Sequence, residues 1–193
     1  MKLTPTPAQT VGPFFGFALP YAGGSELVPQ ARPGSIRLHG TVYDGAGVPI
    51  PDALLEIWQT DEDGAVPRAT GSFVRDGYTF TGFGRAAVDG EGHYTFTTVN
   101  PGPTALGKAP YILITVFARG LLDRLFTRAY LPEDTDALEA DPVLAALEKD
   151  RRRTLIAQRE DDGGLRLDIR LQGEGETVFL AYPHTPQVTG HDA

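Results

Sequence analysis

Histidine is the side chain best suited to proton transfer and metal binding near neutral pH. The chain contains four histidines: His39, His93, His184 and His191. None of them forms a His-x-His or His-x-x-x-His pair, the spacings that place two imidazoles on one face of a strand or a helix. We therefore expect each imidazole to be solvated or held by a single hydrogen bond. A self-contained zinc or non-haem iron site would lack its usual ligands.

Two short runs of carboxylates offer acid–base or cation-binding groups. They are Asp61, Glu62 and Asp63 in the first run and Glu133, Asp134 and Asp136 in the second. Neither spacing matches a calcium-binding loop, so solvated loops are the expected structure. The chain also has no cysteine, no glycine-rich phosphate loop and no GxSxG motif, and we expect no catalytic residue in it.

Arg119 is the one cation whose position is unusual. It ends the most apolar segment of the chain, PYILITVFAR, and is followed by Gly120. A strand there would display the guanidinium at an edge or mouth of its sheet. A weak surface salt bridge is one interpretation, and an arginine that recognises a carboxylate is the other. Spacing by itself favours the salt bridge.

The composition limits the class of protein. With 193 residues and 41% hydrophobic content, the chain is large enough for one domain with a real core. The lack of cysteine predicts a cytoplasmic protein, and no signal peptide or apolar run of ~20 residues is evident. A net charge of -8 disfavours nucleic acid and anionic membranes as partners.

The elements that must position these residues are mainly strands. The 23 glycines and 16 prolines predict many turns. Alternating or apolar segments predict strands at 35–44, 52–61, 84–89, 93–99, 110–118, 125–131, 164–172 and 176–182. We expect the strand at 52–61 to be central, the turn DGEG to close a hairpin between 84–89 and 93–99, and residues 61–83 to form a long excursion.

One short helix is expected after Asp141, which would be its N-cap, with Pro142 at the first position. The fold class is therefore all-β: a β-sandwich with one short helix and an irregular N-terminal arm. That arm contains TVGPFFG, where Phe14 and Phe15 follow Pro13. Proline excludes a regular helix or a central strand through the arm, so the two aromatic rings must be buried by some other packing.

Three ordered blocks of the sequence resemble the intradiol ring-cleaving dioxygenases. They read GTVYDGAGVPIPDALLEIWQTDEDG, FGRAAVDGEGHYTF and NPGP, and the resemblance runs from about Thr4 to Tyr182. It implies a β-sandwich of the intradiol type. In that family, iron(III) held by two tyrosinates and two histidines binds a catechol, and dioxygen cleaves the ring between the two hydroxyl-bearing carbons.

The resemblance also implies that the iron ligands are missing here. The positions that correspond to the two tyrosines carry Val66 and Thr104, and those of the His-x-His pair carry Tyr111 and Leu113. A single phenol among apolar neighbours would not hold a ferric ion. We therefore expect this chain to bind no metal, and expect Fe(III) in a partner chain of the same family within a hetero-oligomer.

The same resemblance implies a function for the N-terminal arm. The family's metal-free chains lay this arm across the partner, beside a pocket for a small aromatic substrate. On this sequence, the pocket residues would be Thr10, Gly12, Pro13 and Arg119, and the partner-interface residues would be Phe14 and Phe15. Packing of one of the two phenylalanines against this chain's own sandwich is the alternative.

The expected organisation is an N-terminal arm and connector at 1–34 that packs on the partner, a β-sandwich at 35–182, and a disordered tail at 183–193. A non-catalytic binding or structural module of the transthyretin-like type is the alternative function. The GTVYDGAGVPIPDALLEIW block alone fits that module, whereas the arm and Arg119 favour the dioxygenase assembly.

Overall fold

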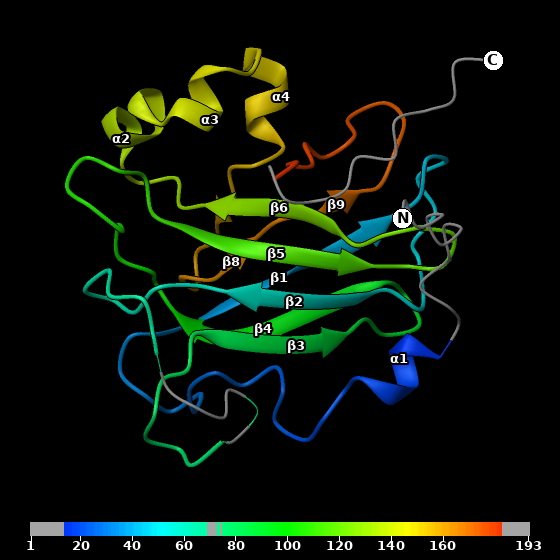
Figure 1. Ribbon diagram of the computed structural model, residues 1–193, viewed down its shortest axis with the longest axis horizontal. Helices are drawn as coiled ribbons and strands as arrows, with labels where there is room; N and C mark the ends of the chain where they lie inside the picture. Colours follow the sequence, from blue (N-terminus) through cyan, green and yellow to red (C-terminus); the bar gives the residue numbers. More distant parts are fainter. Residues whose placement is uncertain (1–13, 69–72, 74, 183–193) are drawn as a thin grey trace, which may run out of the picture.

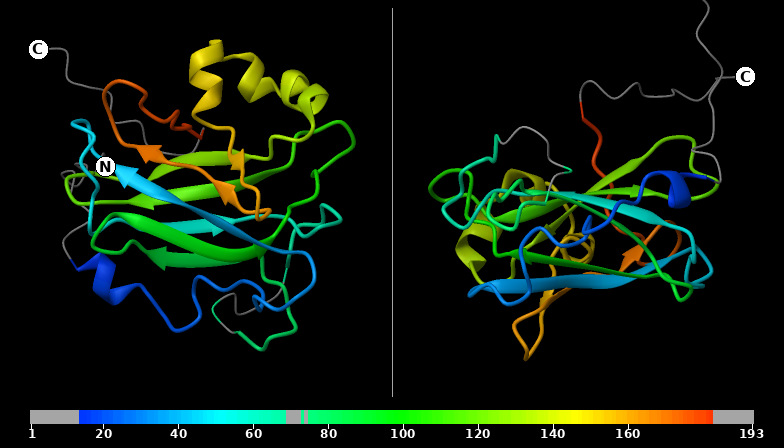
Figure 2. Two further views of the ribbon diagram at one scale, coloured as in Figure 1. Left: turned by 180° about the vertical axis from the view of Figure 1, so that it is seen from behind. Right: turned by 90° about the horizontal axis from the view of Figure 1, so that it is seen from below.

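The structure, a computed structural model, describes residues 14–68, 73 and 75–182, and these form two stacked β-sheets (Figure 1). The first sheet has the strand order β4-β1-β8-β7, with β9 also paired to β1, and the second has the order β3-β2-β5-β6. An edge-on view separates the two layers (Figure 2). The predicted β-sandwich is confirmed, and β2 is an inner strand as expected.

The strands are short. Those of the first sheet are β1 (Ser35–Tyr43), β4 (His93–Val99), β7 (Gln158–Arg159), β8 (Leu165–Arg166) and β9 (Ile169–Arg170). Those of the second are β2 (Leu54–Trp58), β3 (Phe83–Ala87), β5 (Tyr111–Phe117) and β6 (Leu125–Tyr130). All pairs within the second sheet are antiparallel, whereas β1 pairs with β8 and β9 in parallel.

The core lies between the sheets and follows the period of two in the sequence. In β1, Leu38 and Val42 point inward against Tyr94 and Phe96 of β4. From the other sheet, alternate residues such as Ile114 enter the same cluster. Alternation in a strand sends neighbouring side chains to opposite faces, so the other residues of each strand are left for the outer surface.

The predicted hairpin around DGEG is wrong. The turn itself forms, because the amide of Asp89 donates to the carbonyl of His93 at 2.9 Å. The strands on its two sides, however, belong to different sheets: β3 pairs with β2, and β4 pairs with β1. The turn thus carries the chain from one sheet to the other, and both strands bury side chains between the layers, Ala86 from β3 and Tyr94 and Phe96 from β4.

The prediction of a single helix is also wrong. The described residues contain four short helices: α1 (Phe15–Ala18), α2 (Thr135–Ala140), α3 (Pro142–Ala145) and α4 (Lys149–Arg153). Asp141 does cap α3, accepting from the amides of Val143 and Leu144, and Pro142 is the first helical residue, as predicted. None of these helices is long and apolar enough to span a bilayer.

The last predicted strand, 176–182, is not a strand in the structure. The segment runs along β6 and makes only scattered hydrogen bonds, such as the amide of Leu180 to the carbonyl of Phe126 at 2.7 Å. The tail predicted at 183–193 lies outside the described residues.

The connector packs on this chain's own sandwich. Leu27 and Val28 are buried, and the backbone of Glu26 forms an isolated parallel β-bridge with Thr97 of β4. Arg85 of β3 donates to the carbonyl of Leu19 at 2.7 Å and so ties the end of α1 to the sheet. Of the predicted 1–34 unit, this part is therefore covered by its own domain, and packing on a partner stays a prediction for the rest.

Candidate functional site

The loops and strand that carry the four expected ligand positions meet at one end of the second sheet. Val66 follows β2, and Thr104 precedes β5, which begins at Tyr111. The two loops touch at Gly64, which has φ +83°; a Cβ there would lie 2.0 Å from the carbonyl oxygen of Pro103. Glycine is therefore required for this close approach. The structure therefore brings the loop that carries Val66 against the loop that carries Thr104.

Tyr111 and Leu113 point to the outer face of that sheet, where Arg128 of β6 lies opposite Leu113. The guanidinium carbon of Arg128 is 4.0 Å from the centre of the Tyr111 ring. No group of three or more His, Cys, Asp or Glu residues in the described part of the chain could hold a metal ion. The expectation that this chain binds no iron stays a prediction, and it is the residue types that support it.

Arg128 and the buried Tyr130 continue this network inward. Arg128 Nη1 donates to the Tyr130 hydroxyl at 2.8 Å, and that hydroxyl donates to Asp141 Oδ1 at 3.1 Å. Burial raises the pKa of Tyr130, and the hydrogen bond from Arg128 opposes that rise. Burial disfavours the charge on Arg128, but its bond to Tyr130 and the nearby phenols raise its pKa overall. The phenol thus stays neutral and the guanidinium charged at neutral pH.

Arg119 lies at the other end of the same sheet. Tyr111 and Phe117 are the two ends of β5 (Figure 1), six residues apart, or roughly 20 Å at 3.3 Å per residue. Arg119 follows Phe117 by two residues in the chain. Its side chain is 69% exposed, and its Nε lies 2.5 Å from Asp52 Oδ2. Arg119 therefore has the surface ion pair that spacing alone favoured, and it is far from the expected ligand positions on this chain.

Helix α1 lies near the end of the sheet at which β5 ends, two residues before Arg119 (Figure 1). A Cβ added to Gly16 would be 3.9 Å from the carbonyl oxygen of Asp52. Phe15 is 6% exposed and buried within its own chain, whereas Phe14 is 74% and Phe17 is 86% exposed. The interface role predicted for Phe15 conflicts with this burial, because little of its ring is left for a partner to cover.

Three of the four predicted pocket residues, Thr10, Gly12 and Pro13, lie outside the described residues. Pro13 directly precedes Phe14. Phe14 begins the turn that leads into α1, where its carbonyl accepts from the amides of Phe17 and Ala18. The arm therefore enters the described part of the chain at the end of the sheet that carries Arg119.

The expectation of solvated or singly bonded histidines is wrong for His39. This side chain is 7% exposed on the outer face of the first sheet. Its Nδ1 lies 3.1 Å from His93 Nε2, and its Nε2 lies 2.7 Å from Glu160 Oε2. The turn between β7 and β8 carries Glu160 and covers the imidazole. His184 and His191 lie outside the described residues.

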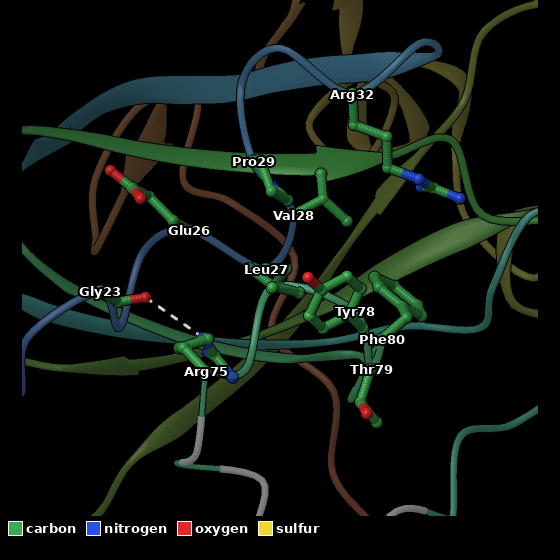
Figure 3. A pocket seen from close by; sticks show the side chains of 11 residues that line it. Gly23, Glu26, Leu27, Val28, Pro29, Arg32, Arg75, Tyr78, Thr79 and Phe80 are labelled. Atoms are coloured by element: carbon green, nitrogen blue, oxygen red, sulfur yellow. Dashed lines mark hydrogen bonds between the residues drawn. The ribbon is translucent and has the colours of Figure 1, made fainter.

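A cleft of about 280 Å³ separates the connector from residues 75–80 (Figure 3). Its walls include Leu27, Val28, Arg32, Arg75, Tyr78 and Phe80. Arg32 is paired with Glu62 at 2.6 Å, and Arg75 donates to the carbonyl of Gly23 at 3.2 Å, the bond drawn in Figure 3. The cleft contains none of the predicted site residues. Because Arg75 binds the connector and Arg32 ties the connector to Glu62, we assign both arginines a structural role.

The model of the dioxygenase family matches residues 12–173. The chain belongs to the dioxygenase family. The alpha chain of protocatechuate 3,4-dioxygenase from Burkholderia cepacia is 39% identical over 194 residues, covering 92% of this chain and 98% of the relative. The beta chain from the same organism is 30% identical over 156 residues, covering 74% of this chain and 66% of the relative.

A solved structure of the dioxygenase domain of a carbohydrate-binding fusion from Streptomyces sp. SirexAA-E has the same fold. The TM-score is 0.57 at 24% identity, over 88% of this chain and 99% of that one. At such an identity the likeness concerns the fold alone. It agrees with the two-sheet architecture of this dioxygenase chain.

Three features of this dioxygenase chain were not predicted from its sequence: the pairing of Asp52 with Arg119, the position of Arg128 over Tyr111, and the side-chain partners of His39. Asp52 was absent from the expected site, although an antiparallel pairing of 52–61 with 110–118 would have placed it near Arg119. Arg128 stands on the same face as Tyr111, a relation that becomes visible only once β5 and β6 are paired. The hydrogen-bond partners of His39, His93 and Glu160, come from distant parts of the chain, so no local sequence pattern predicts them.

Proposed function

We propose that this chain is the metal-free alpha chain of a protocatechuate 3,4-dioxygenase, active together with an iron-bearing beta chain. One observation carries the proposal: Arg119 lies at the opposite end of the sheet from the chain's own ligand positions, which hold Val66, Thr104, Tyr111 and Leu113. A guanidinium at that distance cannot contact a substrate bound at those positions. Its exposure suits a site on a second chain.

The reaction we assign to the assembly is cleavage of 3,4-dihydroxybenzoate by dioxygen to 3-carboxy-cis,cis-muconate. Iron(III) in the beta chain would supply the chemistry that activates the catechol. The role of this chain is to shape the pocket and balance its charge. Arg119 would present a guanidinium to a carboxylate, and the guanidinium plane suits such an anion.

The arm completes the pocket in this proposal. Thr10, Gly12 and Pro13 would line it, with Gly12 allowing close backbone approach and Pro13 keeping the arm stiff. Phe14 would be buried against the beta chain. Its 74% exposure in the isolated chain supports this, and the exposed Phe17 belongs to the same surface.

The proposal includes a cytoplasmic location and a small anionic substrate, and it includes no nucleic-acid or membrane partner. The net charge of -8 supports the last point. Because the chain as a whole repels anions, cationic groups near the pocket become more important.

Co-expression tests the proposal. The chain is produced alone and together with a homologous chain that carries the two tyrosines and the His-x-His pair. We expect a hetero-oligomer that contains iron and cleaves 3,4-dihydroxybenzoate, and a chain without iron or activity when it is alone. Stoichiometric iron with ring cleavage in the isolated chain would refute the proposal. Inactive homo-oligomers in both preparations would instead indicate a non-catalytic module.

A further inference from the structure

Asp52 and Arg119 face each other across the ends of two antiparallel strands. Leu54 pairs with Phe117 in the register of β2 and β5, and extension of that register by two residues sets Asp52 opposite Arg119. Asp52 Oδ2 accepts from Arg119 Nε at 2.5 Å. The Asp52 side chain is 28% exposed and is followed by the buried residues Ala53 and Leu54, so the backbone that carries the carboxylate is anchored in the core.

The other contacts of Asp52 argue against an ordinary turn-capping role. Asp44, Asp61, Asp89 and Asp141 each accept hydrogen bonds from backbone amides of their turns. Asp52 accepts none from the described residues, and its second oxygen, Oδ1, is buried without a partner among them. The polar contact that the described structure gives this carboxylate is therefore the one with Arg119.

The pairing also decides which edge of the guanidinium stays available. Nε is engaged, and no described residue accepts a hydrogen bond from Nη1 or Nη2. These two groups form a planar fork that matches the two oxygens of a carboxylate. Because the ion pair is neutral as a whole, its field at long range is small, and Arg119 offsets the charge of an anion only where its free fork contacts that anion.

We propose that Asp52 is a positioning residue, which orients Arg119 so that its Nη1–Nη2 fork binds a carboxylate in the assembled dioxygenase. The inference rests on the proposed function. The carboxylate belongs either to the substrate or to a side chain of the beta chain. A free arginine that is 69% exposed would sample many rotamers, and the carboxylate of Asp52 removes most of that freedom.

The test is a double-mutant cycle in the co-expressed complex, with D52N, R119A and the double variant. D52N should lower kcat/KM for 3,4-dihydroxybenzoate about tenfold, as expected for a misplaced binding group. In the R119A background the same substitution should have no further effect. D52E, which keeps a carboxylate, should recover part of the loss. E133Q is the matched control, because it breaks the Arg159–Glu133 pair at the opposite end of the sheet.

Two further measurements separate the sources of the carboxylate. If the substrate provides it, D52N raises KM for 3,4-dihydroxybenzoate and leaves KM for catechol, which has no carboxylate, unchanged. If the beta chain provides it, D52N weakens association of the two chains instead. Impairment by R119A with normal kinetics and association in D52N, or an equal effect of D52N in both backgrounds, would overturn the inference. A wild-type complex without ring cleavage would overturn the proposed function itself.

Discussion

The guanidinium of Arg128 covers the ring of Tyr111, with its central carbon 4.0 Å from the ring centre. Tyr111 is the one phenol among the four expected ligand positions. A fixed cation therefore stands over the only side chain that could have become a tyrosinate ligand. The positive charge of Arg128 opposes the approach of a ferric ion, because like charges repel strongly in a partly buried site.

Restoring the ligands should therefore require removal of Arg128 as well. The variant Val66→Tyr, Thr104→Tyr, Tyr111→His, Leu113→His supplies two phenols and two imidazoles, with Arg128 still opposite position 113. We expect it to bind iron(III) at least about tenfold more weakly than the same variant with Arg128→Gln. Metal content after dialysis and the tyrosinate-to-iron absorption band measure the difference.

The control for this pair is Arg124→Gln in the four-ligand variant. Arg124 lies at the opposite end of β6, where it stacks on Phe126. Its removal changes the net charge by the same amount without touching the Tyr111 position. Iron binding that improves equally with Arg124→Gln would show that the overall charge of the chain matters and that the position of Arg128 does not.

The two neighbouring phenylalanines should separate stability from association. Phe15→Ala removes a ring that is 6% exposed and should cost about 3 to 5 kcal/mol of the free energy of unfolding. Phe14→Ala removes a ring that is 74% exposed and should leave that free energy nearly unchanged, while, on the proposed function, it should weaken binding to the beta chain. Urea unfolding of the isolated chain and titration with the partner test the two halves independently. A destabilising Phe14→Ala would contradict this division.

Local pattern predicted the parts of the fold that local physics determines. Alternation located β1 and β4, continuous apolar content located the inner strand β5, and the Asp141–Pro142 pair located the start of α3. The partition of β3 and β4 between two sheets was not predictable in this way, since a tight turn looks the same whether its strands pair or part. The Asp52–Arg119 pair likewise depends on the register of two strands that are far apart in sequence.

His39 should contribute to stability through its two side-chain contacts. Replacement by phenylalanine keeps the ring volume but leaves His93 and Glu160 without their partner in a largely covered site. Loss of these bonds should lower the free energy of unfolding by about 1 to 3 kcal/mol. Glu160→Gln keeps a hydrogen-bonding group and should cost less. Urea unfolding at neutral pH ranks the two variants, and unchanged stability in His39→Phe would refute the role.

Stability should fall in alkaline solution because of the buried phenol of Tyr94. Burial, helped by the negative charge of Asp168, raises the pKa of Tyr94 above its ordinary value. The unfolded chain ionises this phenol at about pH 10, while the folded chain keeps it protonated and bonded to the carbonyl of Leu167 at 2.6 Å. The stabilisation is therefore complete below pH 10. It is lost as the pH rises toward the folded pKa, at about 1.4 kcal/mol per pH unit.

Tyr94→Phe should reduce that alkaline slope by the equivalent of one proton, even though the variant is less stable at neutral pH. Tyr78→Phe serves as the control, because the Tyr78 side chain is 95% exposed and removal of its hydroxyl should leave the slope unchanged. The free energy of unfolding from urea titrations between pH 8 and 11 gives both slopes. Equal slopes in wild type and Tyr94→Phe would mean that the phenol ionises with similar ease in the folded and unfolded chain, and that the interior at this position is accessible to water.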